Sequence, residues 1–205
     1  MTQNTMTLHG SRLSGHAHRV EAFLTILGLP FDYQAAPAEV RQTPAFRALN
    51  PLGQVPVLRD GELVLADSNA ILVYLARRYD KTGSWLPDDP VAAAQVQRWL
   101  SIAAGEVRHG PGEARLIRLF GLPGDLEKAK AVAARLFGFM EAYLAGRSWL
   151  ADSGPTIADL ACYSYIAHAP EGGIALDPYP NLRAWLARVE DIPGFIPMAK
   201  SEVAA

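Results

Sequence analysis

The segment "VPVLRDGELVLA", residues 55–66, limits the possible folds more than any other part of the chain. Two apolar runs flank Asp60-Gly61, the two-residue loop that a type I′ hairpin turn favours. The pattern predicts two antiparallel strands joined by a tight turn. Pro56 cannot donate to a strand ladder, so it belongs at a strand start or an edge. A trans edge proline and a cis bond that turns the Val55 backbone outward both satisfy this requirement.

Asp67 and Ser68 follow the hairpin at once and open a helical pattern that continues to Tyr79. The first turn of a helix has unpaired N–H groups and the positive end of the helix dipole, so it favours anions. Either residue can cap the helix. Alternatively, Ser68 donates a hydrogen bond to a ligand carboxylate while Asp67 faces an ammonium group. The end of an amino acid carries both charges on one carbon, and the two adjacent side chains match it.

The rest of residues 1–80 alternates between strands and helices. The pattern predicts a strand, a helix that Gly28 ends, a second strand and a short helix capped by Thr43, over residues 6–9, 20–27, 29–34 and 43–49. With the hairpin and the helix after it, the order is β-α-β-α-β-β-α. We therefore expect an α/β domain at the N-terminus.

A linker and an all-helical part follow this domain. Residues 81–90 have the composition of a linker, although we expect Trp85-Leu86 to pin the segment to a neighbouring surface. Residues 91–205 carry mostly helical patterns, and Thr156 with Asp159 resembles a capping box. Residues 110–124 mix helix breakers with an apolar core, so no structure is assigned to them. The chain is thus predicted to hold an α/β domain followed by an all-α domain.

Composition argues against several classes of function. Lysine and arginine number 19 against 21 aspartate and glutamate, a net charge of −2, whereas nucleic-acid binding needs a basic face. The lone Cys162 lies in an apolar helical run and is expected to be a buried, inert thiol. Without a signal peptide or an apolar run of ~20 residues, we expect a soluble cytoplasmic protein with no nucleic-acid or membrane partner. Several arginines are expected on solvated helix faces, namely Arg77, Arg78, Arg108, Arg115 and Arg118.

Ser11 and Ser14 lie just before the first helix, where serine usually serves as a loop or cap residue. A hydroxyl at a helix N-terminus can also stabilise a thiolate, together with the helix dipole. His16 and His18 are close by, but they belong to no catalytic-triad order and no metal-ligand pattern. We therefore expect both histidines on the exposed helix face, and no metal site.

Four stretches together resemble the glutathione S-transferase family: "ALNPLGQVPVL", "LADSNAILVYL", "TIADLACYSYIA" and "YPNLRAWLARVEDIPGF". They occur in order and at ordinary spacing, and the resemblance covers nearly the whole chain. It implies a thioredoxin-like N-terminal domain and an all-helical C-terminal domain that contributes the electrophile site, in a homodimer. No metal is needed.

The resemblance also implies a glutathione site in the N-terminal domain. Pro56 would be cis, and Val55 would pair with the cysteinyl backbone of glutathione. Asp67 and Ser68 match the family's acidic-Ser pair, which holds the γ-glutamyl end. Gln54 occupies a position that is often used near the glycyl end.

For catalysis, Ser14 falls where serine-type members place the hydroxyl that activates the thiol, and Ser11 is the alternative. No cysteine lies there, which argues against members that form a mixed disulfide with glutathione, and the subclass stays open. Four residues are candidates for lining the electrophile pocket or lying near it: Trp99, His109, Arg115 and Tyr165. Core packing competes with this role for Trp99 and Tyr165, and a solvated face competes with it for Arg115.

These features predict a glutathione transferase that binds glutathione as a thiolate and conjugates it to small hydrophobic electrophiles, as in detoxification. One alternative is glutathione-dependent peroxide reduction or isomerisation on the same scaffold. Another is a non-catalytic interaction module. The intact set of Pro56, Asp67 and Ser68 argues against a module that has lost glutathione.

Overall fold

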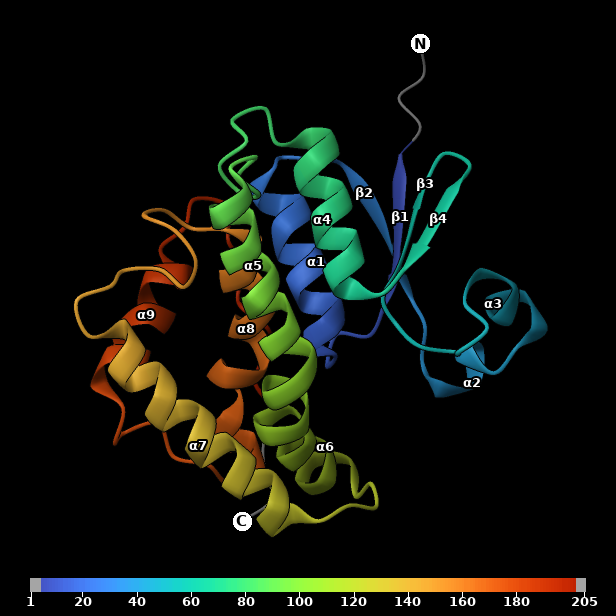
Figure 1. The fold of residues 1–205 in the computed structure, drawn as a ribbon. Coiled ribbons are helices and arrows are strands. Elements are labelled where there is room, and N and C mark those ends of the chain that lie inside the picture. Colours follow the sequence, from blue (N-terminus) through green and yellow to red (C-terminus); the bar gives the residue numbers. More distant parts are fainter. Residues whose placement is uncertain (1–4, 202–205) are drawn as a thin grey trace. The chain divides into compact units, whose positions relative to one another are not determined.

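The computed structural model describes residues 5–201, which form two compact units (Figure 1). The N-terminal unit runs to Lys81 and also includes Pro193–Ala199. The helical unit comprises Thr82–Ile192 and resumes at Lys200. An α/β unit and an all-helical unit therefore follow each other along the chain, as the sequence predicts.

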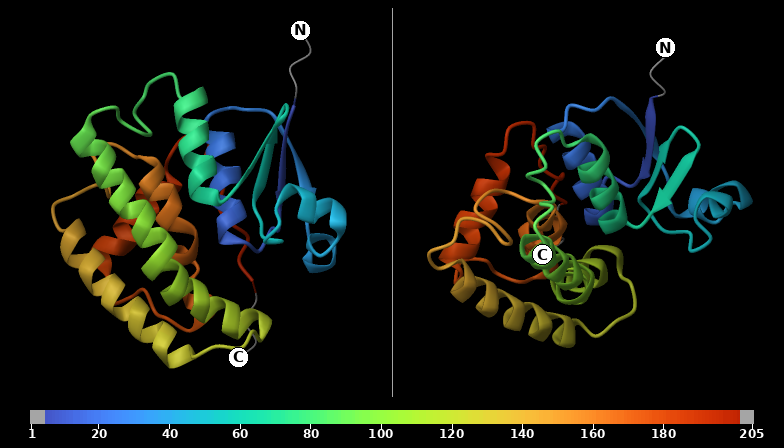
Figure 2. Two further views of the ribbon diagram at one scale, coloured as in Figure 1. Left: turned by 45° about the vertical axis from the view of Figure 1, so that its right-hand side comes forward. Right: turned by 45° about the horizontal axis from the view of Figure 1, so that its top comes forward.

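A four-stranded mixed sheet forms the centre of the N-terminal unit (Figure 2). Its strands lie in the order β2-β1-β3-β4, with bounds Phe31–Ala35, Met6–Gly10, Val57–Asp60 and Leu63–Ala66. The helices α1, α2, α3 and α4 span Gly15–Ile26, Ala38–Arg41, Pro44–Leu49 and Ser68–Tyr79. Since β1 and β2 are parallel, they need a crossover connection, which α1 supplies. The strands β3 and β4 form the antiparallel hairpin on the other side of β1.

The two faces of the sheet carry different helices (Figures 1 and 2). The helices α1 and α4 lie on one face, and α2 and α3 lie on the other. Leu8 and Leu58 pair across β1 and β3 and are both buried. Side chains alternate along a strand, so Val57 points to the opposite face. There it packs with Phe46 of α3, whose ring also contacts His9. The short helix α2, which precedes α3, is not predicted by the sequence pattern.

The hairpin forms where the sequence predicts it, but its turn is shifted by one residue. Asp60 pairs with Leu63, so Gly61 and Glu62 form the loop instead of Asp60-Gly61. Gly61 has a φ of 60°, which glycine adopts without steric cost. The need for this conformation at the first loop position fixes the register, and Asp60 remains in β3.

The Asp60 carboxylate fastens the hairpin to α4, because it accepts hydrogen bonds from the hydroxyls of Tyr74 (2.7 Å) and Tyr79. Burial, together with these hydrogen bonds, raises the pKa of both phenols. Stability from this cluster is therefore complete below the ordinary phenol pKa of about 10 and is lost as the pH rises through the folded-state values.

Asp60→Asn should lower the pKa of both tyrosines because the neutral amide no longer disfavours the phenolates. We expect the free energy of unfolding at pH 8 to fall by about 1–2 kcal/mol. The further loss of stability above pH 10 should become smaller than in the wild type. Phenolate absorbance and denaturant unfolding at a series of pH values measure both effects. An unchanged phenol titration would show that burial alone raises these pKa values.

The second unit consists of helices packed around α8. Its helices α5, η1, α6, α7, α8, η2 and α9 span Pro90–Ile102, Ala103–Gly112, Glu113–Phe120, Leu126–Leu144, Ile157–Ala167, Ala169–Gly172 and Pro180–Glu190. Every residue of α8 from Ile157 to Ile166 is buried, as expected for a helix that is apolar on most sides. The predicted linker before α5 packs against this unit, as expected. Trp85 and Leu86 are buried, and the Trp85 carbonyl accepts a hydrogen bond from the Ile157 N–H at the start of α8.

The predicted capping box at the start of α8 is present, and it holds more than its own helix. The Asp159 carboxylate accepts hydrogen bonds from the Thr156 N–H (2.9 Å) and the Thr156 hydroxyl. It also accepts hydrogen bonds from the Leu150 N–H (3.1 Å) and from the Trp185 indole N–H of α9 (2.9 Å). One buried carboxylate therefore joins α8, the loop before it and α9.

The segment that the sequence leaves unassigned is largely helical. The π-helix η1 runs into α6 without a break (Figure 1). A Cβ added at Gly110 would lie 2.9 Å from the Ala133 nitrogen of α7, and one at Gly112 would lie 3.3 Å from the Tyr165 ring. These glycines therefore reflect close helix packing and not a loop.

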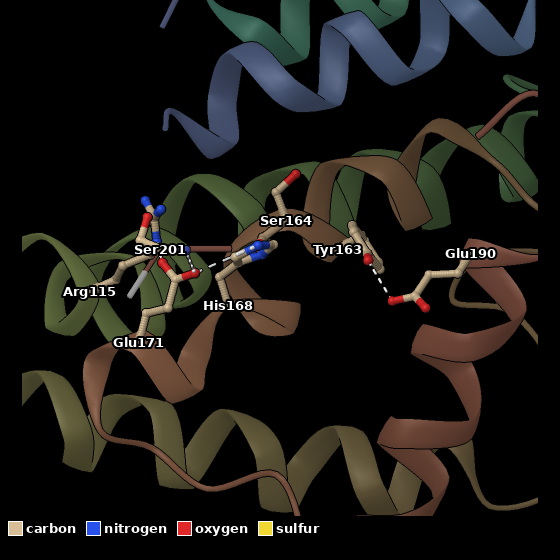
Figure 3. Close-up of polar contacts among 7 residues, drawn as sticks. All are labelled: Arg115, Tyr163, Ser164, His168, Glu171, Glu190 and Ser201. Atoms are coloured by element: carbon tan, nitrogen blue, oxygen red, sulfur yellow. Dashed lines mark hydrogen bonds and ion pairs between the residues drawn. The ribbon is translucent and has the colours of Figure 1, made fainter. Parts of the chain in front are cut away.

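Arg115 of α6 is buried and not solvated, which makes that expectation wrong. Its Nε forms an ion pair with Glu171 at 2.5 Å, and the other carboxylate oxygen of Glu171 accepts the Ser201 N–H at 2.9 Å (Figure 3). His168 lies beside the same carboxylate, with 3.9 Å between the nearest nitrogen and oxygen. A buried charge needs such a partner because desolvation costs several kcal/mol. The pair ties η2 and residue Ser201 to α6.

Candidate active site

A pocket of about 210 Å³ lies in the N-terminal unit at the start of α4. The loop before β3, the end of β4 and one residue of α1 complete its wall. The lining residues are His16, Asn50, Leu52, Gln54, Val55, Pro56, Ala66, Asp67 and Ser68. They include all five residues that the resemblance assigns to glutathione. The structure therefore brings together two segments that flank the hairpin, and adds His16 from α1.

Asp67 caps α4 from a backbone conformation that is rare outside glycine. Its carboxylate accepts the N–H groups of Asn69 and Ala70 at 2.9 Å each. Its φ is 73°, and among residues 5–201 no other non-glycine residue has a positive φ. Such a conformation costs about 1–3 kcal/mol and persists where the surroundings hold it, often at functional sites. Capping is thus confirmed for Asp67, whose exposed side chain also lines the pocket.

Ser68 is the first residue of α4 and is 4% exposed. Its Oγ lies 3.3 Å from Nη1 of Arg19 and 3.2 Å from Nδ1 of His16, both on α1. The same Nη1 of Arg19 donates to Oδ1 of Asn69 at 3.0 Å. The start of α4 is therefore held by a buried arginine from the neighbouring helix, which places a positive charge behind Ser68.

Sequence reasoning missed this network because both histidines were expected on the exposed helix face and Arg19 was given no role. Arg19 is 1% exposed and His18 is 4% exposed, so the expectation of an exposed His18 is wrong. The His18 ring contacts Phe195, and its Nε2 lies 2.7 Å from the Ile196 carbonyl oxygen in the segment that returns to this unit. His16 is half-buried. The signal in the sequence that could have indicated this network is that α1 carries polar residues on several of its faces.

Asn50 shapes the loop that carries Gln54 and Val55. Its side chain accepts the Leu52 N–H at 3.1 Å and donates to the Gln54 carbonyl at 2.9 Å. The Val55-Pro56 peptide bond is cis, as the resemblance implies. Within the described residues the Val55 N–H and C=O have no hydrogen-bond partner, so both groups are available to a ligand.

Ser14 is the N-cap of α1, and its Oγ accepts the Ala17 N–H at 3.3 Å. Ser11 lies one turn earlier, where its carbonyl accepts the Ser14 N–H. Neither serine is among the residues that line the pocket, although His16 is two residues beyond Ser14. Their assignment as the activating hydroxyl and its alternative stays a prediction.

The candidates for the electrophile pocket all lie in the helical unit. Trp99 and Tyr165 are buried there, as the core-packing alternative expects, and Arg115 forms the ion pair described above. His109 is exposed, and its Nδ1 lies 3.2 Å from the Glu113 carboxylate. Contact of any of them with an electrophile stays a prediction.

Two further features concern metals and membranes. Among residues 5–201, no three histidine, cysteine, aspartate or glutamate side chains gather in a way that could hold a metal ion. In the same part of the chain, the helices lack the length and apolar character needed to cross a bilayer. Cys162 is buried, as predicted.

Comparison with known proteins agrees with the fold. Family models for the N-terminal and C-terminal domains of glutathione S-transferases match residues 8–83 and 124–193. Glutathione S-transferase GstB of Escherichia coli (strain K12) is 30% identical over 198 residues, which cover 92% of this chain and 94% of that protein.

Solved structures resemble the chain over nearly its full length. A glutathione S-transferase from Pseudomonas fluorescens has a TM-score of 0.88 and 33% identity, covering 95% of this chain and 99% of that one. A glutathione transferase homolog from Drosophila mojavensis with bound glutathione has a TM-score of 0.81 and 28% identity, covering 92% and 89%. The chain therefore belongs to the glutathione S-transferase family of enzymes.

Proposed function

We propose that the pocket at the start of α4 binds glutathione as its thiolate, and that the enzyme conjugates it to small hydrophobic electrophiles. The observation that supports this most directly is that Val55, Asp67 and Ser68 line one pocket. Ser68 would donate to the α-carboxylate of the γ-glutamyl end, and Asp67 would accept from its ammonium group. The Val55 backbone would pair with the cysteinyl residue, and Gln54 would lie near the glycyl end.

Ser14 would donate its hydroxyl proton to the glutathione sulfur. Its Oγ already accepts the Ala17 N–H, and a serine hydroxyl can accept and donate at the same time. A free thiol of pKa ~8.5 is only about 3% ionised at pH 7. Lowering that pKa by ~2 units requires about 2.7 kcal/mol, which a hydrogen bond to the thiolate and the N-terminus of α1 can supply.

Activation of the thiol alone gives a modest gain in rate. Ionisation at pH 7 rises roughly 25-fold, but nucleophilicity falls with the thiol pKa along a Brønsted slope of ~0.4–0.5. The two effects leave about a threefold gain at pH 7. Most of the acceleration would therefore come from holding the electrophile beside the sulfur.

The pH profile of conjugation tests the role of Ser14. With an aryl halide as the electrophile, Ser14→Ala should lower kcat/KM by about sixfold at pH 6.5 and threefold at pH 7, and should be about sixfold faster than the wild type near pH 9. This pattern is expected because glutathione bound to the variant ionises only at a higher pH. Once formed, its thiolate is more nucleophilic than the thiolate in the wild type. Stopped-flow titration of bound thiolate absorbance gives the thiol pKa directly.

Ser11→Ala serves as the matched comparison, because it removes the alternative hydroxyl from the same loop. Ser14→Ala also removes a helix cap worth about 1 kcal/mol, so the free energy of unfolding is measured in parallel. A wild-type pH profile in Ser14→Ala, with a shifted profile in Ser11→Ala, would transfer the role to Ser11. Binding of glutathione without conjugation of any electrophile would favour the interaction module.

A homodimer, a cytoplasmic location and a role in detoxification also remain predictions from the family resemblance. Light scattering coupled to size exclusion measures the assembly in solution, and a monomer across the micromolar range would contradict the first of them.

A further inference from the structure

His16 contacts Ser68 directly, although the proposed chemistry does not use it. The His16 Nδ1 lies 3.2 Å from the Ser68 Oγ, and both residues line the pocket. On its other side, the same Oγ lies 3.3 Å from the Arg19 Nη1. The hydroxyl that would hold the ligand carboxylate is therefore placed between an arginine and an imidazole.

Counting hydrogens limits what His16 can do in the bound state. An arginine can only donate, so Ser68 Oγ acts as the acceptor of the Arg19 hydrogen bond. A serine hydroxyl has one proton, and that proton goes either to Nδ1 of His16 or to a ligand carboxylate. When the carboxylate takes it, His16 keeps its hydrogen bond to Ser68 only by donating through an Nδ1–H. The neutral Nδ1–H tautomer and the imidazolium both have this proton, but only the imidazolium adds a positive charge beside the carboxylate.

We propose that His16 takes up a proton when the α-carboxylate of glutathione binds Ser68, so that the affinity of the site rises as the pH falls from 7.5 to 5.5. This inference rests on the proposed role of Ser68. His16 would be a positioning residue, which acts on the ligand through the serine hydroxyl.

The charged groups around His16 act in opposite directions. Arg19 on the same helix disfavours a second positive charge near Ser68. Asp67, which lines the same pocket, favours it. The other polar side chains of the pocket wall, Asn50 and Gln54, carry no charge. The carboxylate of the ligand is the charge that changes on binding, so protonation and binding strengthen each other.

S-Methylglutathione is the probe, because its sulfur carries no ionisable proton and its other groups keep their charges between pH 5.5 and 7.5. Titration calorimetry with the full-length protein should give a Kd that falls by about three- to fivefold from pH 7.5 to 5.5. Near pH 7, measurements in two buffers of different ionisation enthalpy should show uptake of up to about half a proton per ligand bound.

Two histidines of α1 provide a matched pair of variants. His16→Asn keeps a donor near the position of Nδ1 but cannot take up a proton, so the proton uptake and the pH dependence should both disappear. His18→Gln keeps a donor near the position of Nε2, which contacts the Ile196 carbonyl, and should retain both. A structural effect of altering α1 would change the Kd of both variants at every pH and would leave their pH dependence equal.

Three results would overturn the inference. One is binding of S-methylglutathione without proton uptake in the wild type, which leaves the proposed glutathione site intact. Another is proton uptake that persists in His16→Asn, which would assign the proton to a different group. The third is absence of S-methylglutathione binding at every pH, which would also overturn the proposed function.

Discussion

Replacing Asp159 with alanine should lower the free energy of unfolding by about 3–5 kcal/mol. This carboxylate is almost completely buried and accepts hydrogen bonds from Leu150, Thr156 and Trp185. Alanine would leave these donors buried without an acceptor, and each unsatisfied group costs about 1–3 kcal/mol before the structure relaxes. Denaturant unfolding of the full chain, followed by far-ultraviolet circular dichroism, measures the loss.

Asp125→Ala is the control for this prediction. Asp125 is the N-cap of α7 and its carboxylate accepts one backbone hydrogen bond, from the Lys128 N–H at 2.9 Å, but its side chain is exposed. Water can replace the lost acceptor there, so we expect a loss of only about 0.5–2 kcal/mol. Equal losses in the two variants would mean that Asp159 acts as a helix cap and nothing more. A much larger loss for Asp159 would show that joining α8, α9 and the preceding loop is its main contribution.

The parts of the fold that sequence predicts best are those set by local rules. The hairpin follows from two apolar runs around a glycine, and the capping box of α8 follows from the spacing of Thr156 and Asp159. Even there, register was off by one residue, because the positive φ of Gly61 decided the turn. Local pattern fixes the kind of element, and the conformational demand of one residue fixes its position.

The parts that could not be predicted depend on contacts between distant segments. Arg19 and Ser68 are 49 residues apart, and nothing in the pattern of α1 indicates that its arginine reaches the start of α4. Arg115 and Glu171 are 56 residues apart, and Arg115 was expected on a solvated face. Buried charges are paired across the fold, so their partners become visible only when the helices are packed.

The candidate site shows the same division. Five residues that line the pocket could be named from the family motifs, which include the loop before β3 and the start of α4. Two residues that support this wall were given no role from the sequence. Asn50 donates a hydrogen bond to the Gln54 carbonyl, and Arg19 donates one to the Ser68 hydroxyl. Here the motifs identify residues of the pocket wall, whereas the groups that support them are set by the packing of the chain.

Replacing Ser68 with alanine should weaken glutathione binding by between about tenfold and a hundredfold. The lost hydrogen bond to a charged carboxylate is worth about 1.5–3 kcal/mol, and each 1.4 kcal/mol is a factor of ten in Kd. Folding should be largely kept, since Arg19 retains its hydrogen bond to Asn69 and Asp67 still caps α4. Titration calorimetry with glutathione gives the Kd, and denaturant unfolding checks the fold.

Ser14→Ala separates glutathione binding from activation of the thiol, because it is expected to change the thiol pKa with a smaller loss of affinity than Ser68→Ala. Ser14 is the N-cap of α1, whereas Ser68 follows the Asp67 cap of α4, so the free energy of unfolding is measured for both variants. A wild-type Kd in Ser68→Ala would contradict the proposed hydrogen bond from Ser68 to the ligand carboxylate. A larger loss of affinity in Ser68→Ala, together with a raised thiol pKa only in Ser14→Ala, would support ligand binding at the start of α4 and thiol activation at the start of α1.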